Sequence, residues 1–206
     1  MYEANTDLLF EQFIKQLEDE KKYISCEVLE HINHELVSLK KNTQENTDTD
    51  RKIDSIIGQI RKVSSELRPV LFEEVGLKIS IEQFIQPLQD KHDLFITTDI
   101  RYKKELGKDH ELQIYRIIQA ALWDIISRAK AKAVKISVVS QPGEVLVTLK
   151  DNSFRFEREN ELRKAYNPGG LSVIIARSKA IGGKTMIQSG NDGTSLMISI
   201  PIPLKK

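Results

Sequence analysis

Residues 5–41 contain no proline or glycine, and this absence constrains the fold more than any other feature of the chain. Proline and glycine are the residues that most disfavour a helix interior, so a long segment without them favours one long helix. Apolar residues recur along it at spacings of three, four or seven, which is typical of one helix face. They are Leu9, Phe13, Leu17, Ile24, Val28, Ile32, Leu36 and Leu39.

A second helix is predicted to begin near Asp50, after a polar connection at residues 42–50. Pro69 weakens this helix near its end. Two such helices form an antiparallel hairpin with more apolar surface than it can bury alone, so a second copy would complete a four-helix bundle and the pattern predicts a homodimer. The second apolar stripe comprises Ile53, Ile56, Ile57, Ile60, Val63, Leu67, Val70 and Leu71.

After Gly76 the pattern becomes mixed, and the order of elements predicts an α+β fold, a mixed sheet with helices on one face. The chain is therefore divided into a helical-hairpin dimerisation domain over residues 1–75 and an α/β sandwich over residues 76–206. The predicted strands cover 93–102, 133–139, 144–150, 184–189 and 194–200. The predicted helices cover 77–90, 110–130 and about 170–182, and a polar loop covers 152–168.

Composition excludes several functional classes. A net charge of +1 provides no field for nucleic acid or for an acidic membrane surface. The apolar runs are too short for a membrane span, and the first residues do not form a signal peptide. Cys26 is the one cysteine, which excludes an internal disulfide and favours a reducing cytoplasm.

Three segments resemble the sensor histidine kinases of the nitrate-sensor type, in the order and spacing of that family. EKKYISCEVLEHINHELVSLK, residues 20–40, is similar to its dimerisation helix, which often reads ERxRISRELHDxINQxLxxLK. Residues 64–85 resemble its LRPxxLxxxGLxxAL segment. YRIIQAALWDIISRAKAKAVKI, residues 115–136, resembles the helix that opens its ATP-binding domain. The resemblance implies a dimerisation and phosphotransfer domain followed by a GHKL-type ATP-binding domain.

In the first segment, the resemblance aligns Leu29 with the phospho-acceptor histidine, and a leucine cannot accept a phosphoryl group. Glu30 and His34 lie four residues apart on one side of the helix. In the family such a pair helps remove phosphate from a response regulator by orienting a water molecule. A surface ion pair is the alternative interpretation. In another register, which compares INHEL with the MSHEL of the larger kinase class, His34 is itself the acceptor.

In the ATP-binding domain, Ala120 replaces the general-base glutamate, Asp124 the metal-binding asparagine and Arg128 a histidine. DNSFRF, residues 151–156, stands where the family has DNGxGF, so two glycines that allow close approach of a nucleotide are lost. Trp123 either fills the space of the nucleotide or is an ordinary half-buried aromatic residue. Asp124 remains a weak candidate ligand for Mg²⁺. The implied degenerate nucleotide site comprises Asp151, Asn152, Gly170, Leu171 and Thr194.

These replacements predict a catalytically degenerate homologue, a pseudokinase of two-component signalling in the cytoplasm. It would dimerise and bind, sequester or dephosphorylate the receiver domain of a response regulator. The alternatives are a phosphotransferase that relays phosphate through His34 or His31, a structural partner that forms a heterodimer with an active kinase, and an active sensor kinase with unusual motifs. No cofactor is established, and weak binding of ATP or ADP with Mg²⁺ is left open.

Overall fold

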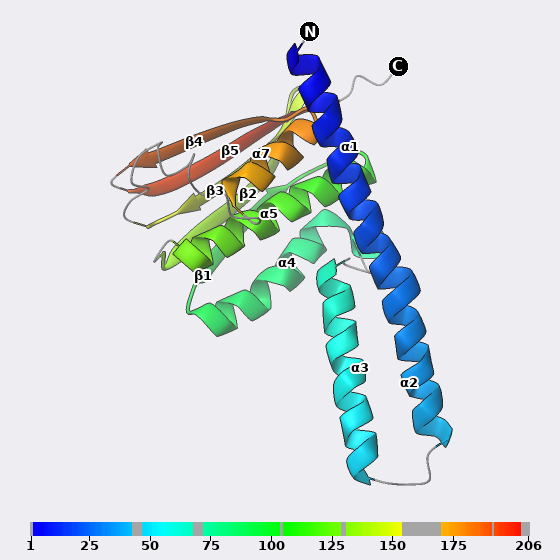
Figure 1. The fold of residues 1–206 in the computed structure, drawn as a ribbon. Helices are drawn as coiled ribbons and strands as arrows, with labels where there is room; N and C mark the ends of the chain where they lie inside the picture. The colour runs from blue at the N-terminus through cyan, green and yellow to red at the C-terminus, as the bar shows by residue number, and fades with distance from the viewer. Residues whose placement is uncertain are drawn as a thin grey trace. The chain divides into compact units, whose positions relative to one another are not determined.

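The computed structural model describes residues 2–42, 47–67, 72–103, 105–128, 131–153, 170–190 and 192–202 (Figure 1). The chain divides into two compact units by its internal contacts. One is helical and covers Lys15–Phe72, and the other covers Met1–Ile14 together with Glu73–Lys206. The predicted domain boundary between residues 75 and 76 stays a prediction.

The helical unit is a hairpin of two antiparallel arms (Figure 1). The first arm begins at Lys15 within α1 (Tyr2–Tyr23) and continues through a π-helical segment η1 (Ile24–Leu29) and α2 (Glu30–Asn42). The second arm is α3 (Thr47–Leu67). The predicted long helix is therefore present, with a π-helical interruption that its periodicity did not indicate. The predicted end of the second helix, which includes Pro69, lies outside the described residues.

Side chains from both arms hold the hairpin together. Ile53 and Ile57 of α3 are buried. Ser25 of η1 lies with its Oγ 2.7 Å from Ser64 Oγ. Lys40 donates to the carboxylate of Asp54 at 2.6 Å, near the closed end of the hairpin. A partly exposed ion pair of this kind contributes little stability, so the apolar contacts and the part-buried serine pair carry most of the packing.

The second unit is an α/β sandwich. Its helices are α4 (Phe72–His92), α5 (Lys108–Arg128) and α7 (Leu171–Ala180). Its strands are β1 (Phe95–Arg101), β2 (Ala133–Gln141), β3 (Glu144–Asp151), β4 (Lys184–Gly190) and β5 (Gly193–Pro201). The sheet order is β1-β2-β3-β5-β4, with β1 and β2 parallel and the other pairs antiparallel. The predicted mixed sheet and α+β class are confirmed.

Strand periodicity explains why the helices cover one face of this sheet (Figure 1). Along β2, Val134, Ile136 and Val138 are buried, while the residues between them are more exposed. Alternate side chains of a strand point to opposite faces, so one face is apolar and packs against α5. The inner side of α5 is almost fully buried and includes Ile114, Ile117, Ile118, Ala121 and Leu122.

Three of the sequence predictions concern a helix, a loop and membrane spans. The predicted helix at 77–90 corresponds to α4 after Gly76, which has φ 76° and ψ 178° and interrupts the helical geometry. Most of the predicted polar loop lies outside the described residues. Among the helices described, none combines the length and the apolar character needed to cross a lipid bilayer.

Candidate functional site

The hairpin carries a groove of about 260 Å³ at the position aligned with the phospho-acceptor. Leu29 is the last residue of η1 and Glu30 the first of α2. Leu29 is half-buried, because it faces α3 across the groove. The lining residues are Leu29, Glu30 and Asn33 from the first arm and Ile60, Arg61 and Ser64 from α3. The groove thus combines an apolar floor with one acidic and one basic side chain.

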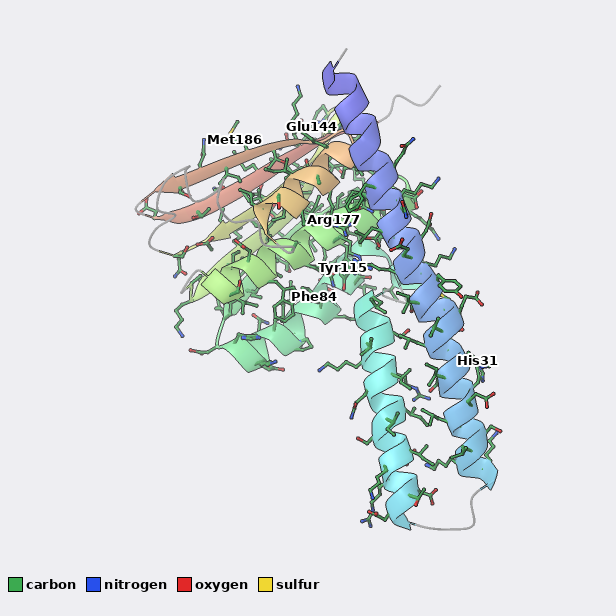
Figure 2. All side chains as sticks on the ribbon, in the orientation of Figure 1. His31, Phe84, Tyr115, Glu144, Arg177 and Met186 are labelled. Atoms are coloured by element: carbon green, nitrogen blue, oxygen red, sulfur yellow. The ribbon has the colours of Figure 1, made fainter. Side chains whose placement is uncertain are left out.

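Glu30 and His34 are both exposed on α2, but only Glu30 lines the groove. Neither side chain makes a hydrogen bond or an ion pair within the described part of the chain. The surface ion pair between them is therefore not formed in this structure. His31, labelled in Figure 2, is also exposed on α2. Both histidines are open to solvent, and the roles predicted for them remain predictions.

Sequence reasoning missed three polar residues of the groove, which are Asn33, Arg61 and Ser64. Asn33 lines it, and its side-chain oxygen Oδ1 is buried without a hydrogen-bond partner in the described structure. A buried acceptor without a partner is costly, so it marks a place where a water or a bound group could donate. Arg61 comes from α3, so predicting it requires knowing which residues of α3 lie opposite the first arm. Asn33 could have been found from its spacing. It follows Leu29 by four residues, and residues four apart lie on the same side of a helix.

The predicted nucleotide site contains one close pair of residues. Asp151 ends β3 and lies opposite Thr194 of β5 in the strand register, and each is 8% exposed. The Ser153 backbone N–H donates to Asp151 Oδ1 at 2.8 Å, and the Ser153 hydroxyl also bonds to that oxygen. Thr194 Oγ1 lies 3.2 Å from the hydroxyl of Ser189. Ser153 therefore occupies one of the two carboxylate oxygens with which Asp151 would receive an adenine amino group.

Two other predicted nucleotide residues have structural roles. Asn152 Oδ1 accepts hydrogen bonds from the backbone N–H groups of Lys132 and Ala133, both at 2.9 Å, and so fixes the start of β2. Gly170 is the N-cap of α7, and its carbonyl accepts from Val173 at 3.0 Å. Gly170 is buried, while Leu171 is half-buried at the first position of the helix.

The metal and base positions lie on α5. Ala120 and Asp124 are half-buried, and the Asp124 carbonyl accepts a bond from the Ser127 hydroxyl at 3.2 Å. No group of three histidine, cysteine, aspartate or glutamate side chains that could hold a metal occurs among the described residues. The side chain of Arg128 lies outside them.

Trp123, which is 47% exposed, packs edge-on against two rings of α4. Its ring centroid lies 6.5 Å from Phe84 and 6.1 Å from His92. Phe84 also contacts Tyr115 of α5, and both are labelled in Figure 2. These edge contacts attach α4 to α5, and both interpretations of Trp123 stay predictions.

A buried polar bridge joins α5 and α7 in the helical layer that carries these positions. Arg177 of α7 is 4% exposed and donates to Gln113 of α5 at 2.6 Å (Figure 2). Nearby on α5, Gln119 donates to the Tyr115 hydroxyl at 3.1 Å. Burial raises the pKa of Tyr115 above its usual value near 10, which keeps the phenol neutral. This polar packing fixes α7 relative to α5.

Comparison with known proteins defines the class. No family model matches the chain. The structure resembles the histidine kinase domain of the blue-light-activated kinase of Erythrobacter litoralis EL346, with a TM-score of 0.57, 10% identity and coverage of 85% of this chain and 94% of that one. It also resembles the histidine kinase AdeS of Acinetobacter baumannii, with a TM-score of 0.51, 14% identity and coverage of 84% and 95%. The fold is therefore that of a histidine kinase domain.

Comparison of sequences identifies which histidine kinases are homologous to the chain. The histidine-protein kinase/phosphatase DegS of Brevibacillus brevis is 25% identical over 181 residues, which are 87% of this chain and 46% of DegS. The oxygen sensor histidine kinase NreB of Staphylococcus carnosus is 22% identical over 209 residues, 94% of this chain and 60% of NreB. The chain thus spans about half the length of these relatives. Its homologues are sensor histidine kinases, and these relatives are consistent with the nitrate-sensor type.

Proposed function

We propose that this protein is a histidine-kinase homologue that acts on the receiver domain of a response regulator without phosphorylating itself. The observation that carries the proposal is Leu29, which lines the hairpin groove where the resemblance places the phospho-acceptor. An isobutyl side chain has no atom that can form a phosphoramidate. Ala120 likewise has no proton-accepting atom at the position of the general base. The protein would then sequester the receiver or dephosphorylate it.

The apolar side of the hairpin supports dimerisation. Ile32 is 41% exposed on α2 and Val63 is 46% exposed on α3. Each lies two residues from a groove-lining charge, Glu30 or Arg61, and residues two apart on a helix point to nearly opposite sides. The exposed apolar side is therefore opposite the groove, and it also includes Leu39 and Ile56. A second copy, or a related active kinase, would cover the apolar side and leave the groove open.

Glu30 and His34 would carry the phosphatase step. A neutral imidazole nitrogen of His34 would accept one proton of a water molecule and direct its oxygen at the aspartyl phosphate. Attack by water breaks the bond between phosphorus and the aspartate oxygen, and releases phosphate and a free carboxylate. Glu30 would orient the receiver at the groove. The solvent exposure of both side chains supports this assignment, because a docked protein can reach them.

The test incubates the purified chain with receiver domains that carry radiolabelled aspartyl phosphate. We expect either faster loss of the label as inorganic phosphate, or a stable complex that retains it. Where phosphate is lost, His34→Ala should slow the loss at least tenfold, within the range typical of general acid–base groups. His110→Ala, which changes a histidine outside the hairpin, is the matched control. Full activity of His34→Ala would contradict the mechanism.

A relay through histidine is the second candidate, and the exposure of both His31 and His34 favours it. In a relay, the phosphoryl group moves from the receiver to an imidazole nitrogen of this chain. The same incubation separates the two functions, because a relay leaves an acid-labile, base-stable label on the protein. An active kinase would instead acquire this label from ATP.

We propose that any binding of ATP or ADP by this chain is weak. Asp151 and Thr194 lie side by side, which suits recognition of an adenine ring. Ser153 already donates two hydrogen bonds to Asp151 Oδ1, and the Asn152 oxygen is bound by the backbone. If ATP or ADP binds, Asp151 would hold the base and Asp124 would face the metal and phosphates. We place this activity in the cytoplasm, where receiver domains are found.

A further inference from the structure

The π-helical segment η1 lies inside a helix that is otherwise uninterrupted. The residues on either side, Tyr23 and Glu30, both have helical backbone angles, with φ −58° and ψ −50° for Tyr23 and φ −67° and ψ −41° for Glu30. A π-helical turn contains one residue more than an α-helical turn, and such segments are frequent at functional sites. η1 ends at Leu29 and therefore adjoins the groove.

The spacing of the inward-facing residues explains the extra residue. Lys21, Ser25, Leu29 and Asn33 follow one another at intervals of four, and all are buried or half-buried. In an α-helix, these 12 residues turn the chain by roughly 1200°, which is about 120° beyond three full turns. One additional residue absorbs about 100° of that excess. The inner side of the arm is continuous because η1 is π-helical.

A hydrogen bond to the other arm fixes η1 in this register. Ser25 is 1% exposed, and its hydroxyl lies 2.7 Å from the hydroxyl of Ser64 and 3.4 Å from the Ser64 carbonyl oxygen. Ser64 also lines the groove beside Leu29 and Glu30. One residue of α3 therefore connects the π-helical segment with the groove.

We propose that η1 is a register switch, held in its π-helical form by the Ser25–Ser64 hydrogen bond. When that bond breaks, the surplus residue is released and η1 becomes α-helical. The turns of α1 next to η1 then rotate by about 100° relative to α2. Leu29, the last residue of η1, then leaves its place in the groove beside Glu30, so a rotation of the first arm controls access to the groove. This inference goes beyond the proposed function and requires no partner.

Cys26 provides the test, because it is the one cysteine of the chain and lies within η1. The rate at which a disulfide reagent such as dithiobis(nitrobenzoate) modifies this half-buried thiol reports the state of η1. Ser25→Ala and Ser64→Ala should each raise the rate about fivefold, the factor of a typical hydrogen bond in an equilibrium. Ser38→Ala, which removes an exposed hydroxyl of α2, is the matched control and should leave the rate unchanged.

The double variant Ser25→Ala/Ser64→Ala separates a switch from a packing defect. It leaves no unpaired buried hydroxyl, so a defect would be relieved and the rate would return to that of the wild type. If η1 is a switch, it would stay α-helical in the double variant. The rate of Cys26 modification would then stay high and would not depend on low denaturant concentrations. Deuterium exchange should then increase over residues 24–30 and not across α3. A wild-type rate in Ser25→Ala, or modification only through global unfolding, would overturn the proposal.

Discussion

Replacing Gly193 by alanine should destabilise the α/β unit more than any other single-methyl addition in the β4–β5 hairpin. Gly193 opens β5 with φ +117°, a backbone conformation that residues with a side chain rarely adopt. A Cβ atom there would lie 1.8 Å from the carbonyl oxygen of Asp151 and 2.8 Å from its carbonyl carbon. Both obstacles are backbone atoms, so they cannot move aside by a change of rotamer.

The expected loss in the free energy of unfolding of Gly193→Ala is the sum of two free-energy costs. The unfavourable backbone angle costs about 1–3 kcal/mol. The overlap, which forces β3 and β5 apart beside Asp151, costs about another 1–3 kcal/mol. We therefore expect Gly193→Ala to lower the free energy of unfolding by about 2–6 kcal/mol, a large fraction of the stability of a typical domain.

Denaturant unfolding of both alanine variants provides the assay, with circular dichroism as the signal. Gly190 is the matched control, because it pairs with Gly193 across the same hairpin and no atom lies within 4 Å of its Cβ position. Gly190→Ala should change the free energy of unfolding by less than about 1 kcal/mol. If the two variants differed by less than about 1 kcal/mol, the close approach of β5 to Asp151 would be wrong.

Three further predictions concern pH, assembly and the core. Because burial raises the pKa of Tyr115, the neutral phenol stabilises the fold fully below about pH 10, and this contribution is lost at higher pH. Tyr115→Phe should therefore reduce the fall in melting temperature above that pH. An unchanged fall in the variant would contradict titration of Tyr115 as its cause. Ile32→Glu should convert the proposed dimer to a monomer in light scattering, while His31→Glu should not. A persistent Ile32→Glu dimer would exclude the proposed interface. Ile114→Ala should cost about 2–5 kcal/mol in denaturant unfolding, since Ile114 is fully buried; a cost below 1 kcal/mol would contradict its place in the core.

Periodicity predicted the elements of this fold well, because burial of apolar side chains selects both the helices and the strands. The alternation along β2 and the apolar side of α5 were visible in the sequence, and the structure confirms both. The π-helical η1 was not predicted. Its residues fit an α-helical stripe nearly as well, and the difference arises from Ser25 meeting Ser64 on the other arm.

The candidate site was predictable only in part. Glu30 was identified from the resemblance of its segment to the family's dimerisation helix, whereas Arg61 reaches the same groove from α3, and spacing along one helix does not show which residues of the other helix it meets. Asn152 illustrates the opposite limit. The resemblance assigned it to a nucleotide, but its side-chain oxygen bonds the backbone at the start of β2. Residues that meet across distant segments escape an argument from local spacing.

Incubation of the purified chain with radiolabelled ATP and Mg²⁺ tests the central claim most directly. The account predicts no stable label on the protein, because Leu29 cannot accept a phosphoryl group and Ala120 cannot act as a base. An active sensor histidine kinase in the same reaction conditions is the positive control. An acid-labile, base-stable label that disappears in His34→Ala or His31→Ala would contradict the account, and would establish an active kinase with a displaced acceptor.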